Sequence, residues 1–268
     1  MKTVLFCGGF GTRLRDYSDR LPKPLVSVGN RPILWNLMKY YAFHGHRDFV
    51  LCLGYRGDLI KRFFLSYDEC LSTDFIMTPT HDRRERKVEL LGPDISDWTI
   101  TFRDTGLHNN IAERLMAVRE EVREEEMFLA NYSDALTDLP LNDLIERFKN
   151  SDAVATFVSV RPSNGLSKIE TDADGTVTGI DYLSDSVLIN GGFFVFRNAI
   201  FDYIKRGDEL VEAPFRRLIR ERKLLTYRYD GFWRAMDTFK DKKKYDDMYE
   251  SGERPWEVWA SAEGPNPC

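Results

Sequence analysis

Residues 4–24, VLFCGGFGTRLRDYSDRLPKP, contain the pattern on which the predicted fold depends. The apolar run 4–7 is typical of a buried strand, and it ends in the glycine-rich stretch 8–14. Glycines let backbone N–H groups approach a ligand closely, because no Cβ stands in the way. A concave row of such donors after a strand suits phosphate oxygens. The stretch therefore predicts a strand followed by a phosphate-binding loop.

Two basic residues, Arg13 and Lys23, accompany these glycines, and Lys23 stands between two prolines. Arginine offers a planar fork and lysine a point charge, and both complement phosphate. The loop is not a P-loop, because no Gly-Lys-Ser/Thr closes it, and its spacing fits the dinucleotide fingerprint poorly. A tight strand-to-helix turn without a ligand is the alternative, which the two clustered charges disfavour. We expect a nucleoside-triphosphate cradle here.

Strand-like and helix-like segments alternate along most of the remaining chain. Strands are predicted at residues 49–53, 98–102, 127–130, 153–160, 187–196 and 224–229, and helices around 34–41, 59–64, 111–122, 141–148 and 215–219. Such alternation favours a parallel sheet with helices on its faces. Gly175 marks a turn, so residues 168–183 are interpreted as an antiparallel hairpin.

Residues 66–97 interrupt the alternation with a polar stretch of mixed charge. We interpret them as an excursion, with a hairpin as one form. Its charges suit a solvated face, or else a subunit contact or a lid. No linker divides the chain, so residues 1–260 are predicted to form one domain, followed by a loose tail at 261–268.

The composition limits the class of protein. With 268 residues, 43% of them hydrophobic, the chain has enough apolar side chains for a sizeable core. A net charge of −5 gives no sign of nucleic-acid binding by bulk charge. The four cysteines form no CxxC pair, so we expect no zinc site. No signal peptide or apolar run of about 18 residues is seen, so a cytoplasmic protein without membrane partners is expected.

Two aspartates are candidate metal ligands. Asp134 follows the apolar run 127–130, and Asp237 follows the Gly-Phe-Trp sequence at 231–233. Ligands of parallel α/β sheets bind beyond the carboxyl ends of strands, and carboxylates suit Mg²⁺. Asp134 could instead cap a helix that begins near Asp138. The spacing alone does not show that the two aspartates meet.

Glycines interrupt the predicted strand at Asn190-Gly191-Gly192. Glycine within a strand indicates close approach of a ligand or of another backbone. The sequence is therefore either a sugar or base contact or a β-bulge.

Together these motifs resemble the sugar-nucleotidyltransferase family from residue 3 to about residue 259, and its cytidylyltransferases most of all. The matching strings are GGFGTRL at 8–14, PKP at 22–24, RPILWNLMKYY at 31–41, LGYRGDLIKRFF at 53–64, DTG at 104–106, INGGFFVF at 189–196, GFWRAMDT at 231–238 and PWEVW at 255–259. The resemblance implies a single Rossmann-like α/β domain with a mixed, mostly parallel central sheet flanked by helices. It also implies transfer of a nucleotidyl group from a nucleoside triphosphate, here CTP, to a sugar 1-phosphate or related phosphorylated acceptor, with release of pyrophosphate.

The resemblance also implies roles for individual residues. The triphosphate would be held by Gly8, Gly9, Gly11, Thr12 and Arg13. Lys23 would contact the α-phosphate, and Asp134 and Asp237 would hold Mg²⁺. The base would lie near Thr105 and Gly106, with Arg114 helping to recognise the nucleotide. Family members are commonly oligomeric, so a homo-oligomer is expected.

The acceptor half departs from the family pattern. The family's Glu-Lys-Pro lysine, which binds the sugar phosphate, is absent, because residues 180–183 read IDYL. Lys168 is a candidate replacement, beside Asn190 and Gly191 as substrate-binding residues. The family's YGDG motif has become YSDA at 132–135.

The missing lysine leaves a second function open, a catalytically idle nucleotide-binding or regulatory homologue. Lys23 and the two aspartates are retained, which argues against it. A dehydrogenase is a distant third possibility, because neither an acidic ribose ligand nor a hydride-transfer partner is recognisable.

Overall fold

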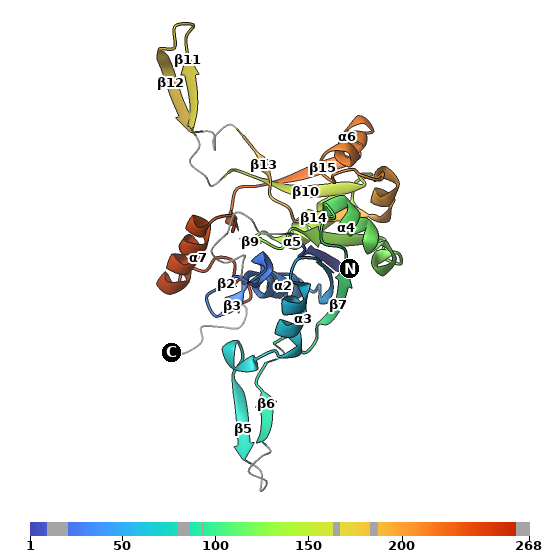
Figure 1. Cartoon of the computed structure of the whole chain (residues 1–268), viewed down its shortest axis with the longest axis vertical. Coiled ribbons are helices and arrows are strands. Elements are labelled where there is room, and N and C mark those ends of the chain that lie inside the picture. Colours follow the sequence, from blue (N-terminus) through green and yellow to red (C-terminus); the bar gives the residue numbers. More distant parts are fainter. Residues whose placement is uncertain (10–20, 80–85, 93, 163–166, 183–186, 261–268) are drawn as a thin grey trace.

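Strand β1 (Thr3–Phe6) lies inside a mixed sheet in a computed structural model of the chain (Figure 1). The structure describes residues 1–9, 21–79, 86–92, 94–162, 167–182 and 187–260. The predicted loose tail at 261–268 lies outside them. The other strands of this sheet are β4 (Asp48–Leu53), β7 (Thr99–Asp104), β8 (Met127–Asn131), β10 (Ala155–Val160), β13 (Ile189–Asn190), β14 (Phe194–Arg197) and β15 (Leu224–Tyr229).

The pairing of these strands confirms a mixed, mostly parallel sheet. Strand β1 pairs in parallel with β4 and β8, β4 with β7, and β10 with β15. Strand β14 is antiparallel between β8 and β10, and β13 is antiparallel to β10. The carboxyl ends of β1, β4, β7 and β8 therefore share one edge, where ligands of such sheets bind.

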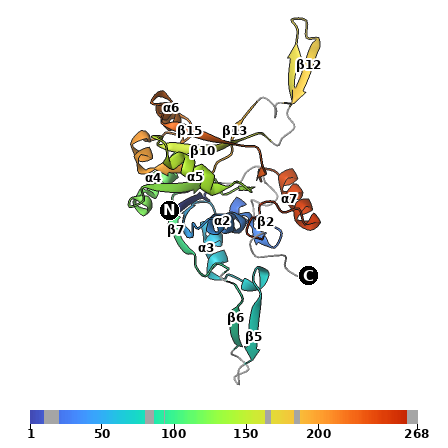
Figure 2. The same ribbon diagram turned by 180° about the vertical axis from the view of Figure 1, so that it is seen from behind.

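Helices cover both faces of the sheet (Figures 1 and 2). One apolar core gathers residues of α2 (Ile33–Phe43), α3 (Gly57–Leu65), α5 (Leu141–Lys149) and α7 (Phe239–Ser251). The other gathers residues of α4 (Ile111–Ala117), η4 (Arg119–Val122), η6 (Asn198–Tyr203) and α6 (Ala213–Arg220). Because apolar residues recur at helical spacing, α5 and α6 each bury one stripe, whereas α2 is buried on nearly all sides. The helices predicted from sequence are confirmed.

Short elements lie between these larger ones near the carboxyl edge. They are η2 (Lys23–Leu25), β2 (Ser27–Val28), β3 (Arg31–Pro32), β9 (Ala135–Thr137) and β16 (Trp233–Ala235). The single strand predicted over 187–196 is wrong, because the chain breaks into β13 and β14 at Gly191 and Gly192. Gly192 has φ 73°, a left-handed conformation that ends strand pairing.

Two antiparallel hairpins project from the body in both views (Figures 1 and 2). One is β5 (Phe75–Pro79) with β6 (Arg86–Leu90), which follows η3 (Glu69–Leu71). The other is β11 (Ser167–Thr171) with β12 (Val177–Tyr182), the hairpin predicted around Gly175.

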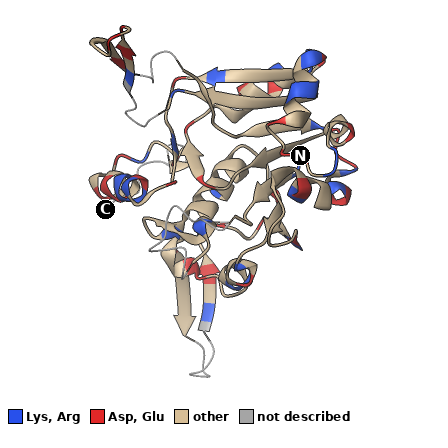
Figure 3. Cartoon of the chain, turned by 45° about the horizontal axis from the view of Figure 1, so that its top comes forward, with Lys and Arg blue, Asp and Glu red and all other residues tan. Residues whose placement is uncertain are grey.

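Basic and acidic residues are interspersed on α7 and across the described chain (Figure 3), in keeping with a small net charge of −5. Within the described residues, no helix is both long and apolar enough to span a membrane.

Candidate active site

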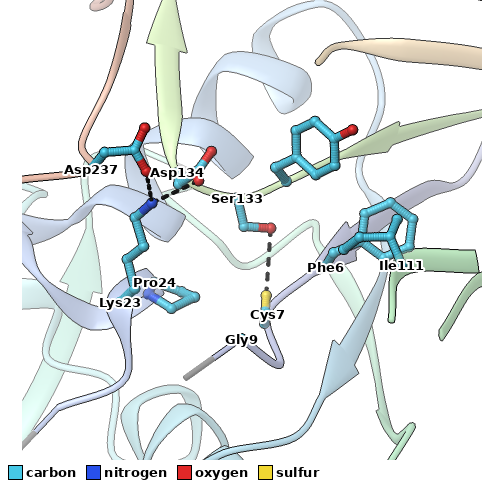
Figure 4. Close-up of a pocket in the computed structure, with 10 residues that line it drawn as sticks. Phe6, Cys7, Gly9, Lys23, Pro24, Ile111, Ser133, Asp134 and Asp237 are labelled. Atoms are coloured by element: carbon cyan, nitrogen blue, oxygen red, sulfur yellow. Dashed lines mark hydrogen bonds and ion pairs between the residues drawn. The ribbon is translucent and has the colours of Figure 1, made fainter. Parts of the chain in front are cut away.

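A cavity of about 340 Å³ opens at the carboxyl ends of β1 and β8 (Figure 4). Its walls are Phe6, Cys7, Gly9, Lys23, Pro24, Ile111, Tyr132, Ser133, Asp134 and Asp237. One end is charged, with a lysine and two aspartates, and the other is apolar and aromatic. Such a cavity suits a ligand with a charged part and a flat organic part.

Lys23, Asp134 and Asp237 meet at the charged end. The Lys23 Nζ donates to Asp134 Oδ2 and to Asp237 Oδ1, at 2.8 Å each. These residues lie 111 and 214 positions from Lys23 in the chain. The sequence left open whether the two aspartates meet, and the structure brings them to the same ammonium group.

The ladder between β9 and β16 places the two carboxylates side by side. The strands are antiparallel with Ala235 opposite Ala135, and the Met236 amide donates to the Asp134 carbonyl at 2.8 Å. Asp134 immediately precedes β9 and Asp237 closely follows β16, so both side chains emerge at the same end of the ladder. Helix α5 has Pro140 at its N-cap without a side-chain cap, so the helix-cap interpretation of Asp134 is wrong.

Burial and charge act in opposite directions on this cluster. Burial raises the pKa of Asp134, and the Lys23 ammonium partly counteracts that rise. Burial alone would lower the pKa of Lys23, but the charges of Asp134 and Asp237 outweigh it and raise the pKa. The ammonium is therefore held firmly in its charged form, as phosphate binding requires.

Ser133, at the position of the first glycine of the family's YGDG motif, has a left-handed backbone conformation. Its φ is 66°, an uncommon conformation for a residue with a Cβ. The Asn131 side chain accepts a hydrogen bond from the Ser133 amide at 3.0 Å. The Cys7 thiol lies 3.5 Å from the Ser133 hydroxyl, so the end of β1 contacts the loop that positions Asp134.

The predicted triphosphate loop is only partly described. Gly8 and Gly9 lie at the end of β1 and border the cavities, whereas Gly11, Thr12 and Arg13 lie outside the described residues. A Cβ on Gly8 would lie 2.1 Å from Arg114 Nη1, whereas one on Gly9 would meet nothing within 4 Å. Gly8 is therefore required by packing, and Gly9 leaves its backbone open towards the cavity.

Arg114, which the sequence predicts near the nucleotide, bonds to protein groups through both terminal nitrogens. Nη1 donates to the Leu53 carbonyl (3.2 Å) and the Thr105 hydroxyl (2.8 Å), and Nη2 to the carbonyls of Gly8 (3.0 Å) and Leu107 (3.3 Å). These bonds use the four protons on its terminal nitrogens. Arg114 is buried and ties together the loops after β1, β4 and β7, instead of presenting these donors to a nucleotide.

Thr105 and Gly106 belong to the same junction. Thr105 is buried, and its hydroxyl donates to the Leu53 carbonyl at 2.8 Å. Gly106 has φ 90°, and its amide donates to the Asp104 carboxylate at 3.0 Å. Both residues shape the loop after β7, and neither borders the main cavity.

A recess of about 190 Å³ adjoins the main cavity. Its walls are Phe6, Gly8, Gly9, Leu107, His108, Asn109, Asn110, Ile111, Arg114 and Glu209. It shares the wall residues Phe6, Gly9 and Ile111 with the main cavity, so the two spaces are neighbours. A nucleotide could place its phosphates at the charged end and its base in the recess.

Asn190 and Gly191 support the cavity from behind its wall. The Asn190 amide group donates to the Tyr132 hydroxyl at 3.2 Å, and the Trp233 indole donates to the Gly191 carbonyl at 2.8 Å. A Cβ on Gly191 would lie 3.1 Å from the Val158 carbonyl. The close approach predicted for these glycines is therefore made by the protein itself, while Tyr132 borders the cavity.

The structure does not bring Lys168 to the site. Lys168 lies on the projecting β11–β12 hairpin, is exposed, and pairs with Glu170 at 2.6 Å. Among the described side chains, none of that hairpin borders the cavity or the recess. The replacement of the missing lysine by Lys168 therefore gains no support from this arrangement.

Sequence reasoning missed several wall residues. Tyr132 and Ser133 precede Asp134 in the YSDA motif, and Cys7 precedes the first glycine. Their adjacency to predicted site residues could have identified them as wall residues. Glu209 lies in a segment without any motif. Only the packing of that segment over the sheet brings it to the recess.

Comparison with known proteins shows which family this chain belongs to. A family model described as nucleotidyl transferase matches residues 2–241. A protein of Bacillus subtilis (strain 168), named a probable glucose-1-phosphate cytidylyltransferase, is 34% identical over 261 residues, covering 97% of this chain and 100% of the relative. The glucose-1-phosphate cytidylyltransferase of Salmonella typhi is also 34% identical, with the same coverage. A UDP-glucose pyrophosphorylase solved with UDP-glucose superposes with a TM-score of 0.67 at 11% identity, covering 94% of this chain and 98% of that one, which indicates a shared fold.

Proposed function

Because the chain belongs to the nucleotidyl transferase family, as a sugar-phosphate nucleotidyltransferase, we propose that it joins CTP to a sugar 1-phosphate or a related phosphate monoester and releases pyrophosphate. The observation that carries this proposal is the meeting of Lys23 with Asp134 and Asp237 at the charged end of the cavity. The choice of CTP rests on the names of the relatives that are 34% identical.

The two carboxylates fit a Mg²⁺ ion. Magnesium prefers oxygen ligands and is usually held by one or two carboxylates, with water and substrate phosphates completing its shell. Among the described residues, no group of three or more potential metal ligands is found, so substrate and water would have to complete the shell. When bound, the ion would neutralise phosphate charge at the site of transfer.

The protein's own groups can then promote an in-line displacement at the α-phosphorus. An acceptor phosphate is already largely ionised at neutral pH, because its second pKa is about 6, so no general base is required. Lys23 would turn from the carboxylates to the α-phosphate and stabilise the charge that develops there. The open backbone at Gly9 would help to hold the departing pyrophosphate, and the cavity would fix the acceptor in line.

The acceptor remains the open side of the proposal. Among the described residues, the β11–β12 hairpin, which reaches the position of the family's Glu-Lys-Pro motif, contributes nothing to the cavity walls, whereas Tyr132 does. The Tyr132 hydroxyl suits a polyol such as a sugar. A sugar 1-phosphate is accordingly the first acceptor to test.

A pyrophosphate-release assay tests the proposal. The purified chain is incubated with Mg²⁺, each of CTP, UTP, dTTP, GTP and ATP, and a panel of sugar 1-phosphates and other phosphate monoesters. We expect release with CTP and at least one sugar 1-phosphate. Binding of CTP without release from any acceptor would instead favour the idle homologue, for which the absent Glu-Lys-Pro lysine is the supporting observation.

The charged cluster gives the first mutational prediction. Lys23→Ala, Asp134→Asn and Asp237→Asn should each lower kcat by about 10²-fold or more, because Lys23 would balance phosphate charge directly and the two aspartates would hold the Mg²⁺ that balances it. Lys149→Ala, an exposed lysine on α5, is the matched control and should retain activity. Circular dichroism should show that the variants remain folded. Wild-type kcat in all three variants would contradict the proposed site.

A further inference from the structure

The recess beside the main cavity has one acidic wall residue, Glu209. Glu209 precedes α6 in the segment that packs over the second core, and its side chain is half-buried. The negative charges of Glu209 and Asp134 add to the effect of burial in raising the pKa of Tyr132. Glu209 borders the recess, whereas Tyr132 and Asp134 border the main cavity.

Most other polar groups around the recess are already used by the protein. The Asn109 amide donates to the Thr105 carbonyl at 2.7 Å. Asn110 caps α4 through its Oδ1 and donates to the Asp208 carbonyl at 2.9 Å. The terminal nitrogens of Arg114 are fully engaged, as described above. These groups build the walls of the recess.

The Glu209 carboxylate is less fully engaged. Its Oε1 accepts a hydrogen bond from the Leu210 amide at 2.9 Å. Within the part of the chain that the structure describes, no lysine or arginine forms an ion pair with it. A carboxylate has about four acceptor positions, so Glu209 retains acceptor capacity.

We propose that Glu209 is a specificity-determining residue that accepts a hydrogen bond from the exocyclic amine of cytosine. This inference rests on the proposed function, and it adds the group that selects the base. Glutamate accepts from the cytosine N4 amine, whereas uracil and thymine present an O4 acceptor at that position. A carboxylate facing uracil or thymine O4 would place two hydrogen-bond acceptors against each other with no proton between them, and they would repel. Glu209 would thus favour CTP over UTP and dTTP.

The position of the recess agrees with this role. The charged cluster would hold the triphosphate at one end of the cavity, and the apolar side chains of Phe6 and Ile111 border both spaces. A pyrimidine ring that passes between these side chains would turn its amine towards the 107–110 loop and Glu209. An incorrect base would cost roughly tenfold to hundredfold in affinity, the usual range for one base-edge contact.

Titration calorimetry with Mg²⁺ and either CTP or UTP, without acceptor, tests this directly. Wild type should bind CTP at least tenfold more tightly than UTP. In Glu209→Gln this ratio should fall at least tenfold, because the amide can accept from cytosine or turn to donate to uracil O4. Glu209→Ala should weaken CTP binding and relieve the repulsion of uracil O4, so its CTP-to-UTP ratio should also fall. The matched control is Glu212→Gln, an exposed glutamate three residues away that borders neither space.

The outcomes separate this inference from the proposed reaction. An unchanged CTP-to-UTP ratio in Glu209→Gln, tighter binding of GTP than of CTP by wild type, or binding of neither pyrimidine nucleotide would overturn the role of Glu209. A wild-type chain that binds CTP over UTP but releases no pyrophosphate with any acceptor would overturn the reaction and leave the role of Glu209 standing. Equal melting temperatures of Glu209→Gln and wild type would show that the substitution acts on binding.

Discussion

At the scale of single residues, two positions serve the site through the backbone. Ser133 holds a left-handed conformation where related motifs have glycine, and its neighbours Asn131 and Cys7 fix it there. Such a conformation costs about 1–2 kcal/mol outside glycine. Asp134 follows directly, so the strained conformation of Ser133 sets the direction in which the Asp134 carboxylate points.

Arg114 gives a prediction at this scale. Arg114→Lys would leave one or more of four backbone and hydroxyl acceptors unpaired in a buried place, which costs about 1–3 kcal/mol. For a chain of this size we expect the melting temperature of the nucleotide-free protein to fall by about 5 °C. The nucleotide KM should rise by about tenfold while kcat changes little, because the loops shift but the charged cluster remains.

Differential scanning calorimetry without nucleotide distinguishes this role from direct recognition. A residue that only touches the nucleotide would change the KM and leave the melting temperature of the free protein unaltered. Arg119→Lys, on the exposed side of η4, is the matched control.

At the scale of elements, the ladder between β9 and β16 decides where the chemistry lies. Neither strand is longer than three residues, yet their register fixes the relative position of Asp134 and Asp237. The ladder is held from outside by Tyr245 of α7, whose hydroxyl donates to the Arg234 carbonyl and accepts from the Leu136 amide. The last helix thus supports the site without touching it.

The turn between α2 and β4 gives a prediction of pH dependence. Burial lowers the pKa of His46 to about 4, and both ring nitrogens are buried without a hydrogen-bond partner among the described residues. The unfolded chain binds this proton near pH 6.5, whereas the folded chain resists it. The contribution of neutral His46 to stability is therefore complete above about pH 6.5 and is lost as the pH falls towards 4.

His46→Gln should make the protein less sensitive to acid over this range, because glutamine does not titrate. The measurement is the difference in urea-unfolding free energy between pH 7 and pH 5, which should be smaller in the variant. Equal differences in the two proteins would show that His46 does not titrate on unfolding. His108→Gln, with its histidine in the loop after β7, is the control and should behave as wild type.

At the scale of the whole molecule, one sheet assembles the site and two hairpins stand away from it. An isolated two-stranded hairpin is at best marginally stable in water. The β5–β6 hairpin nevertheless exposes Phe75, Ile76, Met77 and Val88. The homo-oligomer predicted from the sequence would cover such side chains, with a second copy of the chain as the partner.

Light scattering after size-exclusion chromatography tests this prediction. We expect a mass that is a multiple of 31.2 kDa for wild type and a smaller mass for Ile76→Lys, because a buried charge would oppose association. Thr78→Lys, on the same strand, serves as a control for added charge away from an apolar side chain. A wild-type mass of one chain would contradict the prediction.

Much of the fold follows from local patterns. Apolar runs ending at glycines or aspartates gave the strands, and helical spacing gave the helices, because burial of one face is a local requirement. The strand predicted over 187–196 failed, because an apolar run does not reveal a left-handed glycine within it. The motifs around Lys23, Asp134 and Asp237 identified the residues of the charged cluster through resemblance to a family. The spacing of these residues in the sequence did not show that their side chains meet.

The sequence by itself determined the α/β class and the residue types of the charged cluster, and it predicts that the first loop binds phosphate. The tertiary structure alone decided that Lys23 bridges both aspartates, that Arg114 is used up by protein acceptors, that Lys168 lies elsewhere and that Glu209 reaches the recess. The physical reason is that each of these depends on strand register and side-chain packing between segments tens to hundreds of residues apart. No local pattern encodes such contacts, because each segment's own propensities are satisfied whichever neighbour it meets.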